Sequence, residues 1–104
     1  MTQFRQGDIL LRRIDDAPAG AARVLTATRV VVAQGEKTGH AHAIVGDTVE
    51  LYERDGTLFV SVGARAHVEH EEHATITLPE GTYEVVQQRE YAPGTSRAWR
   101  VVTD

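Results

Sequence analysis

Short runs rich in Val, Ile and Thr, broken at regular intervals by turn residues, constrain the fold of this chain most strongly. No segment shows a sustained helical period, whereas alternation of apolar and polar residues recurs over short stretches. Asp55-Gly56 is the clearest turn signal, because Asp-Gly supplies the positive φ of a type I′ hairpin. With turn signals roughly 8–12 residues apart, we expect about eight or nine strands in an all-β barrel or sandwich.

The turn residues divide the chain into expected strands. Val30, Val31 and Val32 predict a strand that is buried on both faces. Gly46-Asp47 is expected to end one strand before the next begins, and a short helix at residues 17–24 stays an alternative to loop. The expected strands cover residues 8–14, 29–33, 40–45, 48–54, 58–62, 64–69, 74–78, 82–91 and 97–102.

Length and composition limit the classes of protein to consider. The 104 residues suffice for one domain, expected to span residues 1–104. The absence of cysteine excludes disulfides, thiolate zinc fingers, iron–sulfur clusters and cysteine nucleophiles. A net charge of −4 argues against nucleic-acid binding, which needs a basic face. No apolar run reaches the roughly 20 residues of a membrane span. Without an apolar signal core near the N-terminus, we expect a cytoplasmic protein.

The histidines form the chemical feature that stands out. All five lie between residues 40 and 73. His40 and His42 are two apart in an expected strand, so their side chains project from the same face. Two parallel imidazoles at this spacing are able to share one metal ion at roughly 2 Å from each nitrogen. The alternative is that both lie on a solvated face.

A second histidine segment supports the metal interpretation. His70 shares the face of Val68, and His70 and His73 are separated by two glutamates that mark a bend. We expect His40, His42 and one of His70 or His73 to meet around one divalent metal, with His70 as the first choice and His73 or Glu72 as further candidates. Alternatively, the His-Glu-Glu-His segment is a hydrated turn.

The residue types suggest which metal and which chemistry to expect. Three imidazoles with a carboxylate from Glu36, Glu50 or Glu72 and no thiolate suit Zn, Fe, Mn, Ni or Cu, although copper(I) prefers softer ligands. If the metal keeps an open position, it would activate water or a carbonyl, with Glu36 or Glu72 as general base. Arg89 and Tyr91 are candidates to bind a small anionic ligand beside the histidines. Arg89 is alternatively a solvated residue paired with an acid.

Two other functional classes stay open. The first is a metal-free binding or assembly module with its histidines on a polar surface or at a subunit contact. The second is a histidine pH switch, in which clustered imidazoles repel one another when charged. Exposed strand edges in a small β domain also favour pairing with a second copy, so we expect a homodimer.

The segment Gly35–His42 resembles the first half of a cupin motif, in which a glycine precedes His-x-His on a strand and a carboxylate follows. The resemblance implies a small β-barrel that holds a divalent metal in its mouth, with His40 and His42 as ligands. Glu50 would be the carboxylate, several residues later than in cupins. Pro79-Glu80-Gly81 matches the turn of the second cupin motif, but Tyr83 follows where cupins have a histidine.

Two further resemblances concern other parts of the chain. The segments Thr38–His42, His70–His73, Pro79–Tyr83 and Gln88–Tyr91 together resemble a group of small uncharacterised proteins of bacteria and phages, which implies no activity. Gly7–Ile14 resembles the opening strand of co-chaperonins, which would imply an assembly function.

Overall fold

The computed structural model describes residues 2–34, 40–87, 89–91 and 99–101, the last two ranges by their backbone alone, and it confirms the all-β prediction. No helix in the described part of the chain has the length and apolar composition that a membrane-spanning helix requires. The described strands are β1 (Gln3–Gln6), β2 (Ile9–Ile14), β3 (Ala22–Gln34), β4 (Ala41–Arg54), β5 (Thr57–Val62), β6 (Ala66–Glu69), β7 (Ile76–Leu78), β8 (Gly81–Gln87), β9 (Arg89–Tyr91) and β10 (Trp99–Val101).

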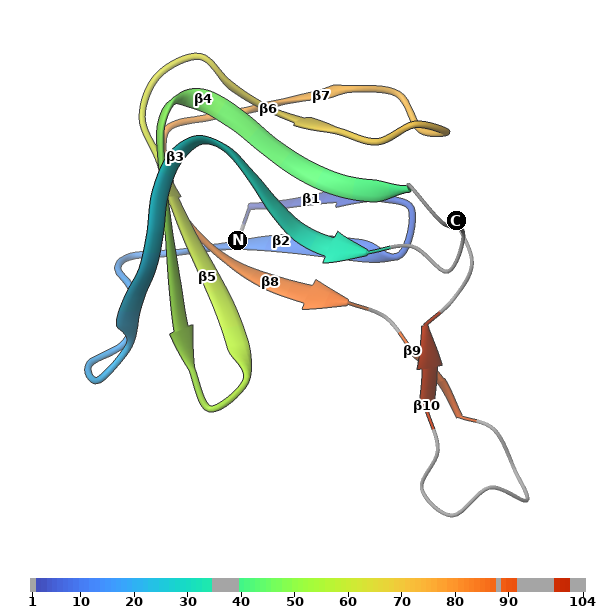
Figure 1. Cartoon of the computed structure of the whole chain (residues 1–104), viewed down its shortest axis with the longest axis horizontal. Helices are drawn as coiled ribbons and strands as arrows, with labels where there is room; N and C mark the ends of the chain where they lie inside the picture. The colour runs from blue at the N-terminus through green and yellow to red at the C-terminus, as the bar shows by residue number, and fades with distance from the viewer. Residues whose placement is uncertain (1, 35–39, 88, 92–98, 102–104) are drawn as a thin grey trace.

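Strands β1 to β8 form one antiparallel sheet that curls into a nearly closed barrel (Figure 1). Its order is β1-β2-β8-β5-β4-β6-β7, with β3 also paired to β4. The long strand β4 makes this curvature possible, because its residues 43–45 pair with β6 and its residues 49–54 pair with β5. The barrel alternative of the sequence prediction is therefore the observed one. Strands β9 and β10 pair with each other in a separate two-stranded sheet.

The prediction that a strand ends at Gly46-Asp47 is wrong, because β4 runs through these residues without a break. A Cβ atom at position 46 would lie 3.2 Å from Cβ of Ala66. Glycine therefore serves here as a point of close approach between β4 and β6 rather than as a turn. Strand β3 is also longer than expected: it begins at Ala22, so the alternative of a helix at residues 17–24 is not realised.

Two tight turns fix the ends of the strands. Asp55 and Gly56 have φ angles of 52° and 81°, which confirms the predicted type I′ hairpin between β4 and β5. Gly7, with a φ of 58°, opens the two-residue turn between β1 and β2. Strand β1 was not predicted from the sequence. The turn that follows it places the next residue, Asp8, in the barrel interior with 3% of its surface exposed.

The apolar core fills the barrel between these strands. Every strand from β2 to β8 contributes a buried side chain, and Tyr83 is the largest of those that are fully buried. The Tyr83 hydroxyl donates a hydrogen bond to the carbonyl of Pro79 at 2.7 Å. The core cluster consists of Ile9, Leu11, Val30, Val32, Ala33, Ile44, Val49, Leu51, Val60, Val62, Ala66, Val68, Leu78 and Tyr83.

Two glutamine side chains join parts of the barrel that backbone pairing leaves apart. Nε2 of Gln6 in β1 donates to the carbonyls of Val68 in β6, at 3.0 Å, and of Ala74 in the β6–β7 loop, at 2.9 Å. Nε2 of Gln87 in β8 donates to the carbonyl of Gln34 at the end of β3, at 3.3 Å. At one end of the barrel, these amide side chains connect the strands in addition to the backbone hydrogen bonds of the sheet.

Candidate metal centre

The two histidine segments lie together at one end of the barrel, where β4 begins and the loop between β6 and β7 turns back (Figure 1). The ring centroid of His70 lies 4.3 Å from that of His42, 4.7 Å from that of His73 and 5.8 Å from that of His40. His42 and His73 are 6.1 Å apart and nearly parallel, with 14° between their planes. The structure therefore brings together all four histidines that the sequence analysis named as candidate ligands.

One of these separations matches that of two imidazoles that share an ion. A metal at about 2.1 Å from a ring nitrogen lies about 3.2 Å from the ring centroid, so two rings bound at tetrahedral or octahedral angles have centroids about 4.5–5.2 Å apart. The His70–His73 distance of 4.7 Å lies in this range, the His42–His70 distance of 4.3 Å is just below it, and the His40–His70 distance of 5.8 Å is above it. Nε2 of His70 and Nε2 of His73 are both buried from solvent.

Hydrogen bonds fold the His70–His73 loop onto the start of β4. The backbone N–H of Ala41 donates to Oε1 of Glu71 at 2.9 Å. Oε2 of Glu72 lies 3.5 Å from Nδ1 of His40. Within the loop, the N–H of Glu72 donates to Nδ1 of His70 at 3.0 Å and sets the orientation of that ring. The two glutamates form the bend that the sequence predicted.

His40, His70 and Glu71 form a group of candidate metal-ligand atoms in the described part of the chain. One ligand atom from each lies within 4.8 Å of the others. The hydrogen bond from the Ala41 N–H lowers the pKa of Glu71, as do its own backbone N–H and the charges of His70 and His40. Glu71 is therefore anionic at neutral pH.

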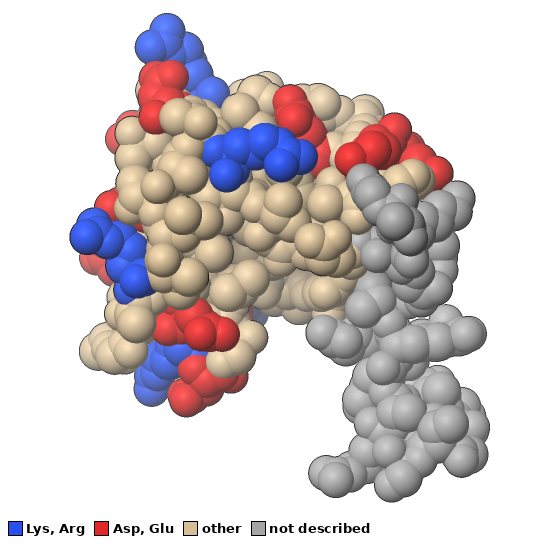
Figure 2. Space-filling view, viewed as in Figure 1, with Lys and Arg blue, Asp and Glu red and all other residues tan. Residues whose placement is uncertain are grey.

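Glu71 was predicted from the sequence only as part of the bend and not as a candidate ligand. The sequence feature that could have indicated Glu71 is its position between two histidines at a bend. At a bend, the carboxylate and the imidazole of neighbouring residues are able to point to the same side of the chain. Figure 2 shows acidic side chains gathered at the end of the molecule where this loop lies, next to the grey region. Negative charge here favours the approach of a cation.

His42 is the most enclosed of the four histidines, with 0% exposure, and both its ring nitrogens are in hydrogen bonds. Nδ1 lies 3.0 Å from Oε1 of Gln6, and Nε2 lies 2.9 Å from Oδ1 of Asp8. The other carboxylate oxygen of Asp8 accepts from Nε2 of Gln87 at 2.9 Å. A buried network thus connects β1, the β1–β2 turn, β4 and β8.

The orientation of Gln6 fixes the role of His42 Nδ1. Because the amide nitrogen of Gln6 faces two carbonyls, its oxygen faces His42, and Nδ1 must donate to it. Nε2 either donates to the ionised Asp8 carboxylate or accepts from a protonated one. In both cases His42 offers no lone pair to a metal while these hydrogen bonds last. Its predicted role as a ligand stays a prediction.

The remaining candidate residues divide into those whose side chains the structure does not describe and Glu50, which lies apart from the cluster. Glu36 falls outside the described residues. Arg89 and Tyr91 are in β9, whose side chains are also outside the description, so their ligand-binding roles stay predictions. Glu50 is on the other half of β4, with Oε2 3.4 Å from Nη1 of Arg23. The fifth histidine, His67, pairs with Glu69 at 2.8 Å.

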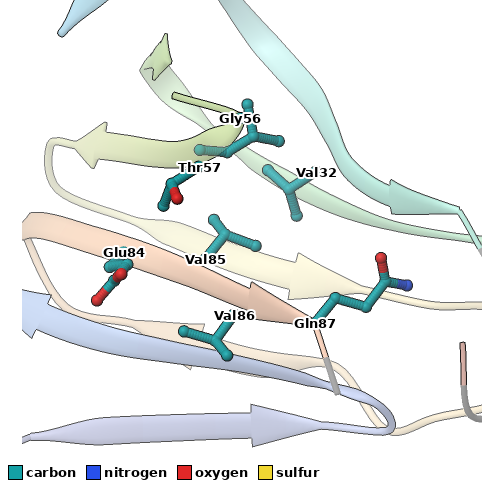
Figure 3. A pocket seen from close by; sticks show the side chains of 8 residues that line it. Val32, Gly56, Thr57, Glu84, Val85, Val86 and Gln87 are labelled. Atoms are coloured by element: carbon teal, nitrogen blue, oxygen red, sulfur yellow. The ribbon is translucent and has the colours of Figure 1, made fainter. Parts of the chain in front are cut away.

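A pocket of about 350 Å³ lies away from the histidines, between β3, the β4–β5 hairpin and β8 (Figure 3). Figure 3 shows Val32 of β3 and Val85 of β8 facing the same space. Gln87 lines this pocket and also donates to Asp8, so one side chain belongs to both features. The full lining consists of Val32, Gly56, Thr57, Leu58, Glu84, Val85, Val86 and Gln87.

The comparisons with known proteins place the chain in a family without assigning it an activity. No curated protein and no solved structure was found to match it. One family model, described as "Domain of unknown function (DUF8820)", matches residues 5–88. The matched range runs from β1 into the end of β8 and so includes every residue of the histidine cluster and of the buried Asp8–His42 network. The chain belongs to this family of unknown function.

Proposed function

We propose that this protein binds one divalent metal ion through His40, His70 and Glu71. The observation that carries the proposal is the approach of their ligand atoms to within 4.8 Å of one another, across two segments that are thirty residues apart in the sequence. Two imidazoles, one carboxylate and no thiolate suit Zn, Fe, Mn or Ni.

The burial of the histidine side chains supports a metal site over the alternative of a metal-free module with its histidines on the surface. His42 and His70 are buried, and His40 has only 22% of its side chain exposed. Clustering imidazoles in the interior of a small barrel costs desolvation energy, which a bound cation would offset. The pH-switch hypothesis uses the same cluster, and the absence of metal from the purified protein would favour it.

The other two histidines have different places in the proposal. His73 is within ring contact of His70 and His42 and is a further candidate ligand, outside the group whose atoms lie within 4.8 Å of one another. His42 is a supporting residue and not a ligand in this proposal, because both its ring nitrogens are hydrogen-bonded to Asp8 and Gln6. Hydrogen-bonded groups of this kind commonly orient metal ligands and tune their affinity.

Metal titration of the protein, produced without a histidine tag, tests the proposal. Elemental analysis and calorimetric titration with Zn²⁺ or Co²⁺ should give near one ion per chain. His40→Ala and His70→Ala should each weaken binding at least tenfold. His67→Ala is the matched control, because His67 is on β6 beside the cluster but pairs with Glu69. Stoichiometry near zero, or equal losses in all three variants, would contradict the proposed site.

A metal-dependent reaction is the second candidate function, favoured by the position of Glu72. Its carboxylate is at the rim of the site, 3.5 Å from Nδ1 of His40. A metal with few protein ligands leaves positions for water, and a nearby carboxylate takes the proton from that water. Hydrolysis of p-nitrophenyl acetate by zinc-loaded protein is the test. Glu72→Gln should abolish it, whereas Glu69→Gln, on the His67 side, should not.

A further inference from the structure

We infer that Gln6 is a positioning residue for the metal centre, one that holds the loop carrying His70, Glu71 and His73 against β4. The inference rests on the proposed metal site. Gln6 contacts none of the three proposed ligands through an observed hydrogen bond, yet its side chain is 3% exposed and sits between both halves of the centre. It would act by fixing the positions of the ligand side chains.

The hydrogen bonds of Gln6 fall at both ends of the ligand loop. Its Nε2 donates to the carbonyl of Val68 at 3.0 Å and to that of Ala74 at 2.9 Å. These two carbonyls flank residues 69–73, which include two of the three proposed ligands, His70 and Glu71, and the further candidate His73. One amide group therefore closes the base of the loop, from a strand more than sixty residues earlier in the chain.

The amide oxygen of Gln6 completes the connection. It accepts from Nδ1 of His42 at 3.0 Å, and His42 is on β4 two residues after His40. All three hydrogen bonds require the same orientation of the amide, because the flipped group would direct its oxygen at two carbonyls. No other side-chain type offers two donors and one acceptor in this flat arrangement except the shorter Asn. Gln6 thus ties β1, β4 and the ligand loop together.

Variants of Gln6 separate this role from general packing. Gln6→Met keeps the volume of the side chain but removes all three hydrogen bonds. Gln6→Glu keeps an acceptor for His42 but has no donor for Val68 or Ala74. Gln3→Met, at the exposed start of the same strand, is the matched control. Removing a group that supports metal ligands typically weakens metal binding about 10–100-fold.

The first measurement is Co²⁺ binding followed by its visible absorption spectrum, which reports ligand geometry. Gln6→Met and Gln6→Glu should bind Co²⁺ about 10–100-fold more weakly and with an altered spectrum, and Gln3→Met should match the unaltered protein. Unchanged affinity and spectrum in both Gln6 variants would overturn the inference. Tighter binding in Gln6→Met would also overturn it and would show that Nδ1 of His42, once released from Gln6, is a ligand.

The second measurement needs no metal and so distinguishes failure of the inference from failure of the proposed site. In metal-free protein, amide hydrogens of residues 69–73 should exchange faster in both Gln6 variants, while those of β5 keep their protection. The side-chain amide hydrogens of Gln6 in the unaltered protein should exchange slowly. Rapid exchange of these hydrogens would show that Gln6 does not hold the loop, even if no Gln6 variant folds. If the unaltered protein binds no Co²⁺, the metal proposal fails and these exchange results still decide the role of Gln6.

Discussion

The carboxylate of Asp8 lies 2.9 Å from Nε2 of His42 inside the barrel, where the two side chains are 1% and 0% exposed. A hydrogen-bonded pair this deeply buried is costly to desolvate, and its partners must be well placed to offset that cost. Gln87 donates to the second carboxylate oxygen, and Gln6 accepts from the second ring nitrogen. Each group of the pair therefore has at least two hydrogen bonds, so the pair is a fixed support beneath the histidine cluster.

Replacing Asp8 with alanine should destabilise the fold by about 3–5 kcal/mol, because it leaves the other member of a buried pair without its partner. Urea denaturation followed by circular dichroism measures the change. The double variant Asp8→Ala/His42→Leu should recover part of the loss, since neither polar group then remains buried. A double variant that is less stable than Asp8→Ala would show that the pair contributes little and that packing of the imidazole dominates.

Metal binding should break the hydrogen bond from the Glu72 N–H to Nδ1 of His70. In the metal-free protein Nδ1 accepts this bond at 3.0 Å. A metal on Nδ1 would take the same lone pair. A metal on Nε2 would move the ring hydrogen to Nδ1, which then no longer accepts. NMR should therefore show an upfield shift of the Glu72 amide hydrogen on adding Zn²⁺, with no comparable shift at Glu53 on the far end of β4. An unmoved Glu72 signal at saturating metal would exclude His70 as a ligand.

Tyr83 should make the stability of the protein depend on pH in the alkaline range. Burial raises the pKa of its hydroxyl above the ordinary value of 10.0, although the charge of Arg13 opposes this. A group whose pKa is higher in the folded state contributes stability below its unfolded pKa and loses it as pH rises through the folded pKa. The free energy of unfolding should therefore fall above pH 10.0.

Phenylalanine at position 83 tests this assignment. Tyr83→Phe should lose about 1 kcal/mol at neutral pH, because the hydrogen bond to the Pro79 carbonyl is removed. It should also flatten the alkaline fall, whereas Tyr52→Phe keeps Tyr83 and should retain that fall. Equal alkaline slopes for Tyr83→Phe and the unaltered protein would assign the effect to another group.

The parts of this structure that follow from neighbouring residues were predictable. Alternating side chains predicted most of the strands after β1, and Asp55-Gly56 predicted its hairpin, because both depend on local backbone geometry. The expectation that His40 and His42 share a face stays a prediction, because β4 begins at Ala41 and His40 precedes it. Gly46 was misread as a turn because its role depends on Ala66, which approaches it from another strand.

Residues that act through distant partners were not predictable in this way. Gln6 is in a short, mostly polar strand, and nothing near it in the sequence indicates that it hydrogen-bonds to Val68, Ala74 and His42. The same holds for Asp8, whose partners lie 34 and 79 residues away. Periodicity reports which face is buried, but it does not report which strands meet across the barrel.

Glu71→Gln should remove most of the stabilisation that a metal ion gives to the fold. A ligand that binds only the folded protein, at 100 times its Kd, stabilises it by about 2.7 kcal/mol, and this appears as a rise in Tm. Glutamine keeps the size of Glu71 and its acceptor for the Ala41 N–H, but it lacks the charge that holds a cation. Thermal unfolding with and without Zn²⁺ should therefore show a large rise in Tm for the unaltered protein and a small one for Glu71→Gln. Glu69→Gln, outside the cluster, should keep the full rise, and an equal rise in all three proteins would remove Glu71 from the ligand set.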